Sequence, residues 1–551
     1  MKALPVLLNL TANYCFQMSL VQKFLSIILF FPFCALGQTF TSSNLPLVVL
    51  NTNGLAIVDN PKIPATMGII CNGPGKRNKL TDPKNDFNGN ISIEIRGSSS
   101  QGFPKKSYGF ETKSIEMVDM DVSLLGLPEE SDWILYAPYT DKTMIRDVFT
   151  YTMDASLGHY SPRCRYVELF LNGRYDGVYV LMEKIKRNKN RVDIAKLLTT
   201  DTAGENLTGG YIIKIDKSTG GGGGQGWYSD YINNTNKTFY QFDYPKSDEI
   251  TIEQKSYIQS YVRNMEKALY TQKFTGTGNY HEFLNDTSFI DFMIVNEFAK
   301  NVDGYRLSSY LYKGKNKLMN CGPIWDFNLT YGNADYYNGW VTTDFQYQAN
   351  LGYDEWQNPF WWNKLMLDPN FVQKLKRRWG WIRKNEFSNE RINFVTDSLT
   401  SLLSEAQVRN YQRWPIIGID IWPNYYVGPT YASEIIWMKN WMTERLDYLD
   451  TMWPYDFTGN ENLMASQTHS VYPNPFTDQI NIQLAPSING SGTVELFNTS
   501  GLLIRQSNIE IQNGQIQLEF GGSKSLNPGM YVLRISQNNR LLLTEKIIKR
   551  P

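Results

Sequence analysis

The sequence predicts an α+β fold that is followed by a small C-terminal β-sandwich. From about residue 38 to 113, apolar and polar residues alternate, as in residues 91–95, and this period of two indicates β-strands. Helical spacing of apolar residues dominates three later stretches, at about residues 252–269, 288–300 and 370–452. The last part of the chain returns to short alternating strands separated by Gly, Asn and Pro. Since 551 residues exceed what one core holds, we expect two or three domains.

The N-terminus has the layout of a secretory signal. Residues 24–34 form an apolar run, Lys23 precedes it, and Ala-Leu-Gly follows at 35–37. The run is too short to span a bilayer, which takes roughly 20 apolar residues. We therefore expect residues 1–37 to be removed on export, with Met18 as an alternative start. A buried first helix is the other interpretation.

Charge and cysteine content narrow the classes of function. The chain has 54 Lys and Arg against 54 Asp and Glu, so its net charge gives no reason to expect a nucleic acid or an anionic membrane as partner. After the signal, no stretch has 18 uncharged apolar residues in a row, and we expect no transmembrane segment. The mature cysteines are Cys71, Cys164 and Cys321, too widely spaced for a disulfide framework or a zinc cluster. One bridge with a free thiol and three buried thiols both stay open.

Three local patterns predict defined elements in the middle of the chain. Apolar spacing over residues 141–157 favours an amphipathic helix. Residues 166–171 and 177–181 form two predicted strands joined by Asn-Gly at 172–173, the pair that suits a type I′ turn. The glycine run at 220–224 lacks the Lys and Ser/Thr of a phosphate-binding loop, so it predicts a plain loop.

Charged residues mark two strand ends in the β-rich part. Over residues 95–108, a strand enters a turn of small residues, and Lys105 and Lys106 begin the next strand. Free backbone N–H groups in such a turn, with a lysine beside them, can hold phosphate oxygens. An ordinary hairpin with solvated lysines is the simpler explanation of this segment alone. Glu183 ends the strand that follows the Asn-Gly turn, at a place suited to a hinge.

Two aspartates lie in loops of the later part. Asp303 follows an apolar helix and precedes a strand at 309–312, while Asp326 stands between Trp325 and Phe327. A lone buried carboxylate costs several kcal/mol, so an acid among large apolar residues needs a partner. Two loop aspartates in this order are the arrangement of phosphoryl transfer in protein kinases. Capping of turns explains either one taken singly.

Taken together, these segments resemble the CotH family of atypical kinases over about residues 90–333. The motifs that carry the resemblance are Ile-Arg-Gly-Ser-Ser-Ser-Gln at 95–101 with Pro-Lys-Lys-Ser-Tyr at 104–108, Met-Ile-Arg-Asp at 144–147, Leu-Asn-Gly-Arg-Tyr-Asp-Gly-Val-Tyr at 171–179 running into Glu183, Asn-Val-Asp-Gly at 301–304, and Trp-Asp-Phe at 325–327. The resemblance implies a two-lobed, protein-kinase-like domain over residues 38–453, with ATP and Mg²⁺ bound between the lobes.

The family's site residues carry over to positions in this chain. By this resemblance, Asp303 orients or deprotonates the acceptor hydroxyl, and Asp326 holds Mg²⁺ against the phosphates. The implied nucleotide-binding residues are Arg96, Gly97, Ser98, Ser99, Lys105, Lys106 and Glu183. One of the two lysines reaches the phosphates, the turn at 97–101 covers them, and Glu183 lies near the adenine.

Two implied metal positions depart from the kinase pattern. Five residues after Asp303, where kinases place a metal-binding asparagine, stands Ser308. After Trp-Asp-Phe, where many relatives carry a second aspartate, stands Asn328. The implied metal positions are thus Asp326, Ser308 and Asn328, and the last two bring no charge to a site for a hard cation. Single-metal binding, slow turnover and no catalysis all stay open.

Residues 471–551, after a polar linker at 454–470, resemble the C-terminal sorting domain of proteins exported by the type IX secretion system. The motifs are Tyr-Pro-Asn-Pro-Phe at 472–476, Asn-Thr-Ser-Gly at 498–501, Pro-Gly-Met-Tyr at 528–531 and Lys-Ile-Ile-Lys at 546–549. The resemblance implies passage through the periplasm and outer membrane by the type IX machinery, to the cell surface or the medium, with later removal of the tail. A structural accessory domain is the alternative.

We therefore expect an exported CotH-like kinase that transfers the γ-phosphoryl group of Mg-ATP to Ser or Thr of an acceptor protein. A catalytically silent surface or assembly protein that keeps the fold is the second interpretation, favoured by Ser308 and Asn328. A carbohydrate-active enzyme is the third, based on the aromatic content and the acids at 354–355. No pair of carboxylates stands out as acid and nucleophile for that chemistry.

Overall fold

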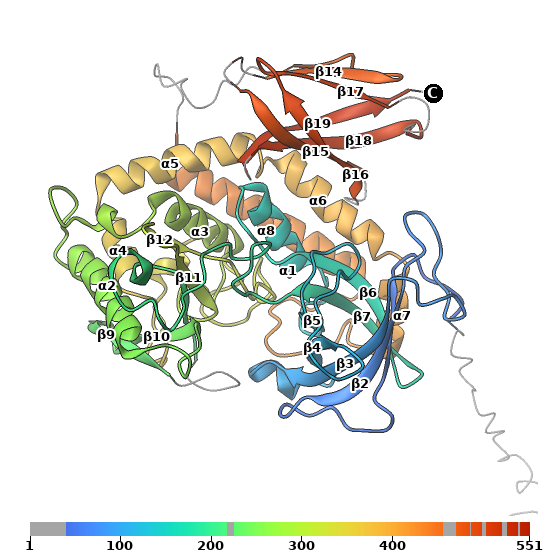
Figure 1. Ribbon diagram of the computed structural model, residues 1–551, viewed down its shortest axis with the longest axis horizontal. Helices are drawn as coiled ribbons and strands as arrows, with labels where there is room; N and C mark the ends of the chain where they lie inside the picture. The colour runs from blue at the N-terminus through green and yellow to red at the C-terminus, as the bar shows by residue number, and fades with distance from the viewer. Residues whose placement is uncertain are drawn as a thin grey trace, which may run out of the picture. The chain divides into compact units, whose positions relative to one another are not determined.

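The structure is a computed structural model that describes residues 40–217, 225–455 and 470–550, except 485, 487, 499–502, 521–525 and 538–539. The predicted signal at 1–37, the glycine run at 220–224, most of the linker, and Thr499, Ser500 and Gly501 of the Asn-Thr-Ser-Gly turn lie outside the described residues. Strands and helices both contribute extensively to the described part (Figure 1), and this confirms the predicted α+β class.

The first seven strands close into a barrel. They are β1 (Leu47–Asn51), β2 (Ile63–Ile70), β3 (Phe87–Arg96), β4 (Ser107–Lys113), β5 (Asp132–Tyr136), β6 (Cys164–Leu171) and β7 (Arg174–Glu183). Their order around the barrel is β1-β2-β3-β4-β5-β7-β6. Neighbours are antiparallel, except that β1 pairs with β6 in parallel. Inward-facing apolar side chains such as Ile91, Phe110 and Leu181 fill the barrel.

The sequence predicts strands in this region but not their closure into a barrel. Closure depends on the pairing of Leu47 with Glu168 and of Leu50 with Leu171, which come from opposite ends of the region. No local period reveals such a long-range pairing. The hairpin of β6 and β7 is confirmed, since Asn172 and Gly173 have φ of 50° and 77°, as a type I′ turn requires.

Helix α1 (Arg146–Ser156) lies where apolar spacing predicts a helix, but it begins at Arg146 rather than at residue 141. Asp141 is the reason. Its carboxylate accepts the backbone N–H groups of Thr143 at 3.0 Å and Arg146 at 2.9 Å, and it pairs with the Arg146 guanidinium at 2.5 Å. These buried contacts fix the preceding residues as a loop that leads into the helix.

A second sheet of five antiparallel strands follows the barrel in the chain. Its order is β12 (Met319–Cys321), β11 (Ser309–Lys313), β8 (Tyr211–Ile215), β10 (Asn236–Tyr244) and β9 (Gly226–Asn233). One face, which includes Ile213, joins the main core with helices α2 (Ile252–Tyr270) and α3 (Asp286–Ala299). Because side chains alternate along a strand, Lys214 and Tyr310 lie on the opposite face.

Five further helices follow in this domain. These helices are α4 (Trp361–Leu365), α5 (Pro369–Lys384), α6 (Asn389–Leu402), α7 (Ala406–Arg413) and α8 (Tyr431–Met452). Short 3-10 helices occur earlier in the domain, at Ser99–Gly102, Gly204–Leu207, Tyr280–Glu282 and Gln346–Gln348. Helices therefore dominate residues 370–452, although 414–430 are not helical. Helix α7 attaches this region to the barrel, because Arg409 pairs with Glu168 at 2.7 Å and the Trp414 indole donates to the Asp176 carbonyl at 2.8 Å.

The C-terminal region is β-rich, as the alternating pattern predicts. One sheet has the order β13 (Ser470–Tyr472), β14 (Gln479–Gln483) and β17 (Gln515–Glu519), and the other β16 (Leu503–Ile511), β15 (Gly490–Asn498), β18 (Gly529–Gln537) and β19 (Arg540–Lys549). Both sheets contribute to one core, with Ile480 and Leu518 from the first and Leu496 and Leu533 from the second. A shared core of two sheets is the basis of a sandwich.

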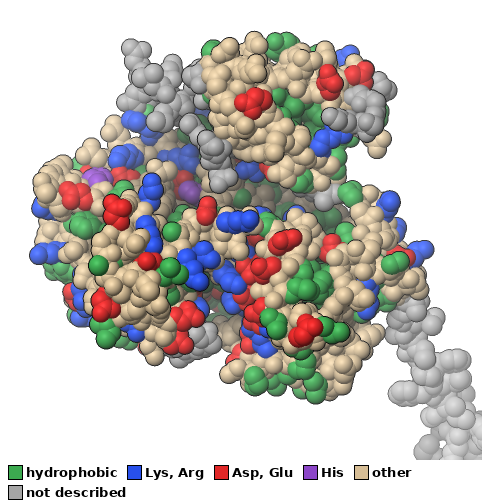
Figure 2. Space-filling view, viewed as in Figure 1, with side chains coloured by type: hydrophobic (Ala, Val, Ile, Leu, Met, Phe, Trp, Pro, Cys, Tyr) green, Lys and Arg blue, Asp and Glu red, His purple; other side chains and the backbone are tan. Residues whose placement is uncertain are grey.

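Cys71, Cys164 and Cys321 are free thiols. Cys321 is buried, and Cys71 and Cys164 are half-buried. Over the described ranges, no helix is both long and apolar enough to cross a membrane. Figure 2 shows acidic and basic side chains interspersed on the visible face, in agreement with the balanced charge of the chain.

Candidate active site

Asp326 lies in a loop after β12 that helix α1 holds in place. Its φ is 66°, in the left-handed region that non-glycine residues seldom adopt and that often marks a functional position. The Asp326 backbone N–H donates to the Tyr151 hydroxyl at 3.1 Å, and the next N–H, of Phe327, donates to Asp147 Oδ1 at 2.7 Å. Since Tyr151 in turn donates to Asp147 at 3.2 Å, two side chains of α1 fix the backbone that presents Asp326.

The electrostatic environment of Asp326 is strongly negative. Desolvation and the carboxylates of Asp147, Asp303 and Asp216 raise its pKa to about 7, and Arg96 is the group that lowers it. The Asp326 side chain is itself solvent-exposed, so the desolvation comes from surrounding protein and not from complete enclosure. Clustered carboxylates with raised pKa values favour the binding of a cation.

Asp303 lies in the loop between α3 and β11 and is held by a buried arginine. The side chain of Asp303 is 24% exposed, and it pairs with Arg306 at 2.8 Å. The Tyr336 hydroxyl lies 3.4 Å from each carboxylate oxygen. Arg306 also pairs with Asp354 at 3.1 Å and donates to the Trp356 carbonyl at 3.0 Å, so it anchors the Asp303 loop to a distant segment.

Arg96 is the cation that the structure brings to Asp326. It is the last residue of β3, and its guanidinium lies 5.5 Å from the centre of the Trp325 ring. Burial lowers its pKa, while Tyr310 and Asp326 act in the opposite direction. Gly97 follows with φ of 111°, and a Cβ there would lie 2.0 Å from Ser100 Oγ, so the turn requires glycine at this position.

The rest of the turn is accessible to solvent. Ser98 and Ser99 are exposed, and the Gln101 amide donates to the Gly97 carbonyl at 2.8 Å. Lys106 is half-buried and donates to the Gln101 carbonyl at 2.5 Å, so its ammonium supports the turn from within.

Lys105 lies inside the protein, in the contact between the barrel and helix α7. It is 2% exposed, and its ammonium donates to the Val178 carbonyl at 2.5 Å and to Asn410 Oδ1 at 2.9 Å. The Tyr179 ring lies beneath it at 4.8 Å. Lys105 therefore connects the barrel to α7.

This burial gives a pH-dependent prediction for Lys105→Met. Burial lowers the pKa of Lys105 from 10.5 to about 7, so between these values the unfolded chain binds a proton that the folded chain does not. The stability of the wild type therefore rises with pH in this window, and the variant lacks that contribution. From pH 7 to pH 9.5, we expect the free energy of unfolding to shift by about 3 kcal/mol in favour of the wild type, measured by urea denaturation. Parallel pH profiles of the two proteins would contradict it.

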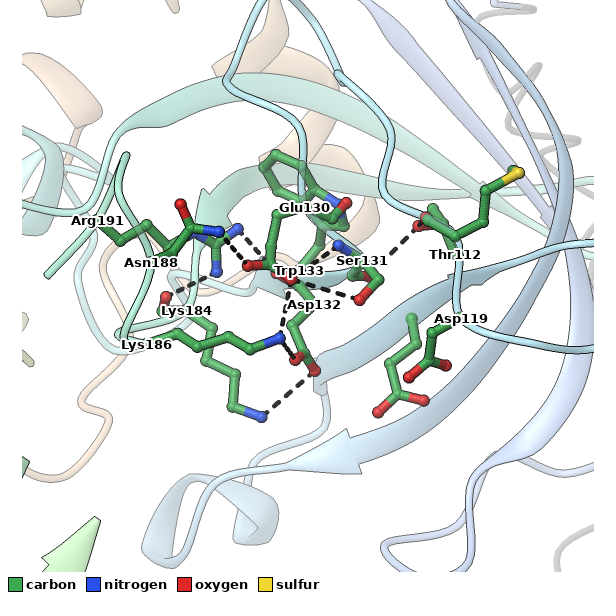
Figure 3. A network of polar contacts seen from close by, with 12 residues as sticks. Thr112, Asp119, Glu130, Ser131, Asp132, Trp133, Lys184, Lys186, Asn188 and Arg191 are labelled. Atoms are coloured by element: carbon green, nitrogen blue, oxygen red, sulfur yellow. Dashed lines mark hydrogen bonds and ion pairs between the residues drawn. The ribbon is translucent and has the colours of Figure 1, made fainter. Parts of the chain in front are cut away.

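Glu183 is buried at the end of β7 within ion pairs of the barrel. It accepts the backbone N–H and the Nε–H of Arg163, each at 3.1 Å, and lies 3.8 Å from Arg191. The chain that follows is tied to β5, because Lys186 pairs with Glu130 at 2.8 Å and with Asp132 at 2.7 Å (Figure 3). Ion pairs thus hold the chain in place at and after Glu183, the position predicted as a hinge.

The two positions that depart from the kinase pattern lie in the same loops as Asp303 and Asp326. Ser308 is half-buried, has φ of 48° and directly precedes β11. The Asn328 amide donates to Thr140 Oγ1 at 3.3 Å, and its backbone carbonyl accepts from Asn333 at 2.8 Å. Neither residue adds charge to the site.

Sequence reasoning did not single out Asp147 and Asp216 as members of this group. Asp147 stands inside the Met-Ile-Arg-Asp motif, and Asp216 follows directly on β8, yet neither has a local pattern that marks it as an acid of the site. Asp147 is 6% exposed, and its pKa is raised to about 6, mainly by burial. Its second oxygen lacks a hydrogen bond of normal geometry, although the Tyr136 hydroxyl is near enough to lower that pKa.

The donor set suits a small, hard cation bound together with phosphate. Within the described ranges, no group of three or more His, Cys, Asp or Glu side chains lies close enough to hold a metal ion unaided. Mg²⁺ in nucleotide sites is held by one or two carboxylates, with water and phosphate oxygens as the other ligands. Exposed Asp326 and the neighbouring carboxylates that raise its pKa fit that arrangement.

Residues 93–449, more than half of the chain, match the family described as CotH kinase protein. The chain belongs to the CotH family. The match includes Arg96, Asp303 and Asp326, so the CotH domain contains the whole charge group described above. The barrel also uses β1 and β2, which precede the matched residues.

Residues 470–550 match the secretion system C-terminal sorting domain. A chain with this type IX sorting domain is secreted or reaches the cell surface. A solved structure, dimeric latent PorU from Porphyromonas gingivalis, matches over 15% of this chain and 9% of that chain, at 17% identity and a TM-score of 0.13, which is too slight to bear on the fold. No curated protein matches the chain.

Proposed function

We propose that the CotH domain transfers the γ-phosphoryl group of Mg-ATP to a Ser or Thr hydroxyl of an acceptor protein. The observation that supports it is the convergence of Arg96 from the barrel with Asp303 and Asp326 from the second region of the domain. Phosphoryl transfer needs little besides positioning and charge stabilisation, and these groups provide both. In this proposal the barrel serves as one lobe of a kinase-like pair, and the sheet with its helices serves as the other.

Each residue has a distinct role in the proposed reaction. Asp303 accepts a hydrogen bond from the acceptor hydroxyl and takes its proton as the oxygen attacks the γ-phosphorus. The bond from that phosphorus to the bridging oxygen breaks, and ADP leaves. Arg96, in place of the lysine of other kinases, faces the phosphate oxygens beside the Gly97 turn. Asp326 holds Mg²⁺, which when bound neutralises charge on the phosphates.

Binding and transfer in Asp326→Asn test this proposal. With ATP at 100 times its dissociation constant, Mg-ATP should stabilise the wild type by about 2.7 kcal/mol, seen as a rise in Tm. The wild type should also transfer labelled γ-phosphate to casein or myelin basic protein. In the variant, we expect the Mg²⁺-dependent rise to disappear and transfer to fall at least about 100-fold.

Asp335→Asn is a matched control. Asp335 is an exposed acid of the same loop region whose described contact is a backbone N–H donated to the Pro423 carbonyl. This variant should label acceptors like the wild type. If Asp326→Asn also labels them like the wild type, the proposed role of Asp326 is wrong.

A silent surface protein that keeps the kinase fold is the second candidate. It is favoured by Ser308 and Asn328, which leave two metal positions without charge. Such a protein would show no rise in Tm with Mg-ATP, whereas a slow kinase would show the rise with little labelling. ADP release measured without any acceptor separates a slow enzyme from an inert one.

A further inference from the structure

Asp216 lies beside the position at which kinases place a second metal-binding residue. In the ladder between β8 and β11, Ile215 is paired with Ser309. Asp216 directly follows Ile215 and Ser308 directly precedes Ser309, so the two residues flank the same end of this ladder. Since adjacent strands lie about 4.8 Å apart, a carboxylate leaves β8 at the end of the sheet where the uncharged Ser308 enters β11.

The side chain of Asp216 belongs to the face of the sheet that is turned toward Asp326. Side chains alternate along β8, so Asp216 lies on the same face as Lys214, opposite Ile215. Lys214 is paired with Tyr310 of β11. Tyr310 and Trp325 both pack against the apolar cluster that contains Ile212 of β8, so this face of the sheet lies against the residue that precedes Asp326.

Asp216 is positioned by its backbone and remains open to a ligand. The Gln241 amide donates to the carbonyls of Asp216 at 2.8 Å and Lys217 at 2.7 Å, and this fixes the end of the strand. The Asp216 carboxylate accepts the Lys217 N–H at 2.9 Å, and Lys214 is 3.7 Å away. The side chain is 26% exposed. A carboxylate that is fixed, loosely paired and accessible has the properties of a metal ligand.

We propose that Asp216 supplies the second carboxylate of the divalent-cation site at Asp326, in place of the ligands that Ser308 and Asn328 do not provide. This inference rests on the proposed function. Two protein carboxylates together with phosphate oxygens and water complete a Mg²⁺ site, so no third acid is required. The second carboxylate of the site then comes from the end of β8 instead of from position 308 or 328.

A Mg²⁺ titration of full-length Asp216→Asn tests the inference. ATP is held constant, Mg²⁺ is varied, and Tm is recorded. We expect the Mg²⁺ midpoint to rise at least about tenfold relative to the wild type. Binding of ATP without metal should become stronger, because a negative charge beside the phosphates is removed. A variant that was merely misfolded would lose both forms of binding.

Two further variants control this experiment. Asp243→Asn removes an acid of β10, the strand that pairs with β8 on its other side, and it should keep the wild-type Mg²⁺ midpoint. Asp216→Asn combined with Ser308→Asp places a carboxylate at the neighbouring position 308, and it should bring the midpoint back to within about threefold of the wild type.

The outcomes separate this inference from the proposed function. If Mg-ATP leaves the Tm of the wild type unchanged, both are overturned. A second outcome is that Mg-ATP raises the Tm of the wild type but not that of Asp326→Asn, while Asp216→Asn keeps the wild-type Mg²⁺ midpoint. In that case only the role of Asp216 is overturned. A raised midpoint that Ser308→Asp restores supports it.

Discussion

Asp303→Asn is expected to bind Mg-ATP like the wild type and to lose phosphoryl transfer by about 10²–10⁴-fold. Asparagine keeps the shape of the side chain and its contacts with Arg306 and Tyr336, but it cannot accept a proton from the acceptor hydroxyl. The loss should therefore fall on kcat and leave the nucleotide-dependent rise in Tm in place. Single-turnover labelling of an acceptor protein, beside a Mg-ATP thermal titration, measures both quantities.

Asp354→Asn is the matched control for that experiment. Asp354 pairs with the other arm of Arg306 and accepts the Tyr337 hydroxyl at 2.6 Å, so this variant disturbs the same arginine without removing the proposed base. We expect its transfer rate to stay within about tenfold of the wild type. Equal losses in the two variants would show that Asp303 acts only as an anchor for Arg306.

Arg445→Ala is expected to lower the free energy of unfolding by about 3–5 kcal/mol. Arg445 and Glu297 are fully buried and pair at 3.0 Å, and the guanidinium also donates to the backbone carbonyls of Thr342 at 2.9 Å and Asp344 at 2.6 Å. Removing the arginine leaves Glu297 as an uncompensated charge. Urea unfolding at neutral pH measures the loss.

A double variant separates the charge from the packing at this pair. In Arg445→Met with Glu297→Gln no buried charge is left, so we expect part of the stability to return. Glu297 also accepts the Tyr305 hydroxyl at 2.8 Å, and Tyr305 precedes Arg306 in the Asp303 loop. The pair therefore supports the site as well as the core. A loss below about 1 kcal/mol in Arg445→Ala would contradict this account.

Export places a constraint on the proposed activity. The sorting domain directs the protein out of the cytoplasm. Because ATP is scarce outside the cell, a working kinase needs a local supply of nucleotide or acts during transit. The labelling and thermal-shift experiments above use added ATP, and so they test the capacity of the site independently of this supply.

Local patterns in the sequence determined several elements because each depends on neighbouring residues. Asn172 and Gly173 lie between two alternating apolar runs and both adopt the positive φ angles of a type I′ turn, so the hairpin of β6 and β7 was predictable. The apolar neighbours of Asp326, and the place of Asp303 in a loop before a strand, singled out these two aspartates. The motifs around them indicated the CotH family.

The tertiary structure alone decided which charges meet. Lys105 and Arg96 both flank the small-residue turn, but Lys105 is directed into the contact with α7, whereas Arg96 lies beside Trp325 and Asp326. Asp147 and Asp216 reach the site from a helix and a strand far away in the chain.

The same holds for the barrel, because the pairing of β1 with β6 joins segments that no local period relates. A sequence period reports which face of one element is apolar, whereas the closure of a sheet and the meeting of charges depend on contacts between distant elements. The sequence by itself therefore determined the family, several of the elements and the two loop aspartates. The tertiary structure decided which cation and which further acids lie around these aspartates.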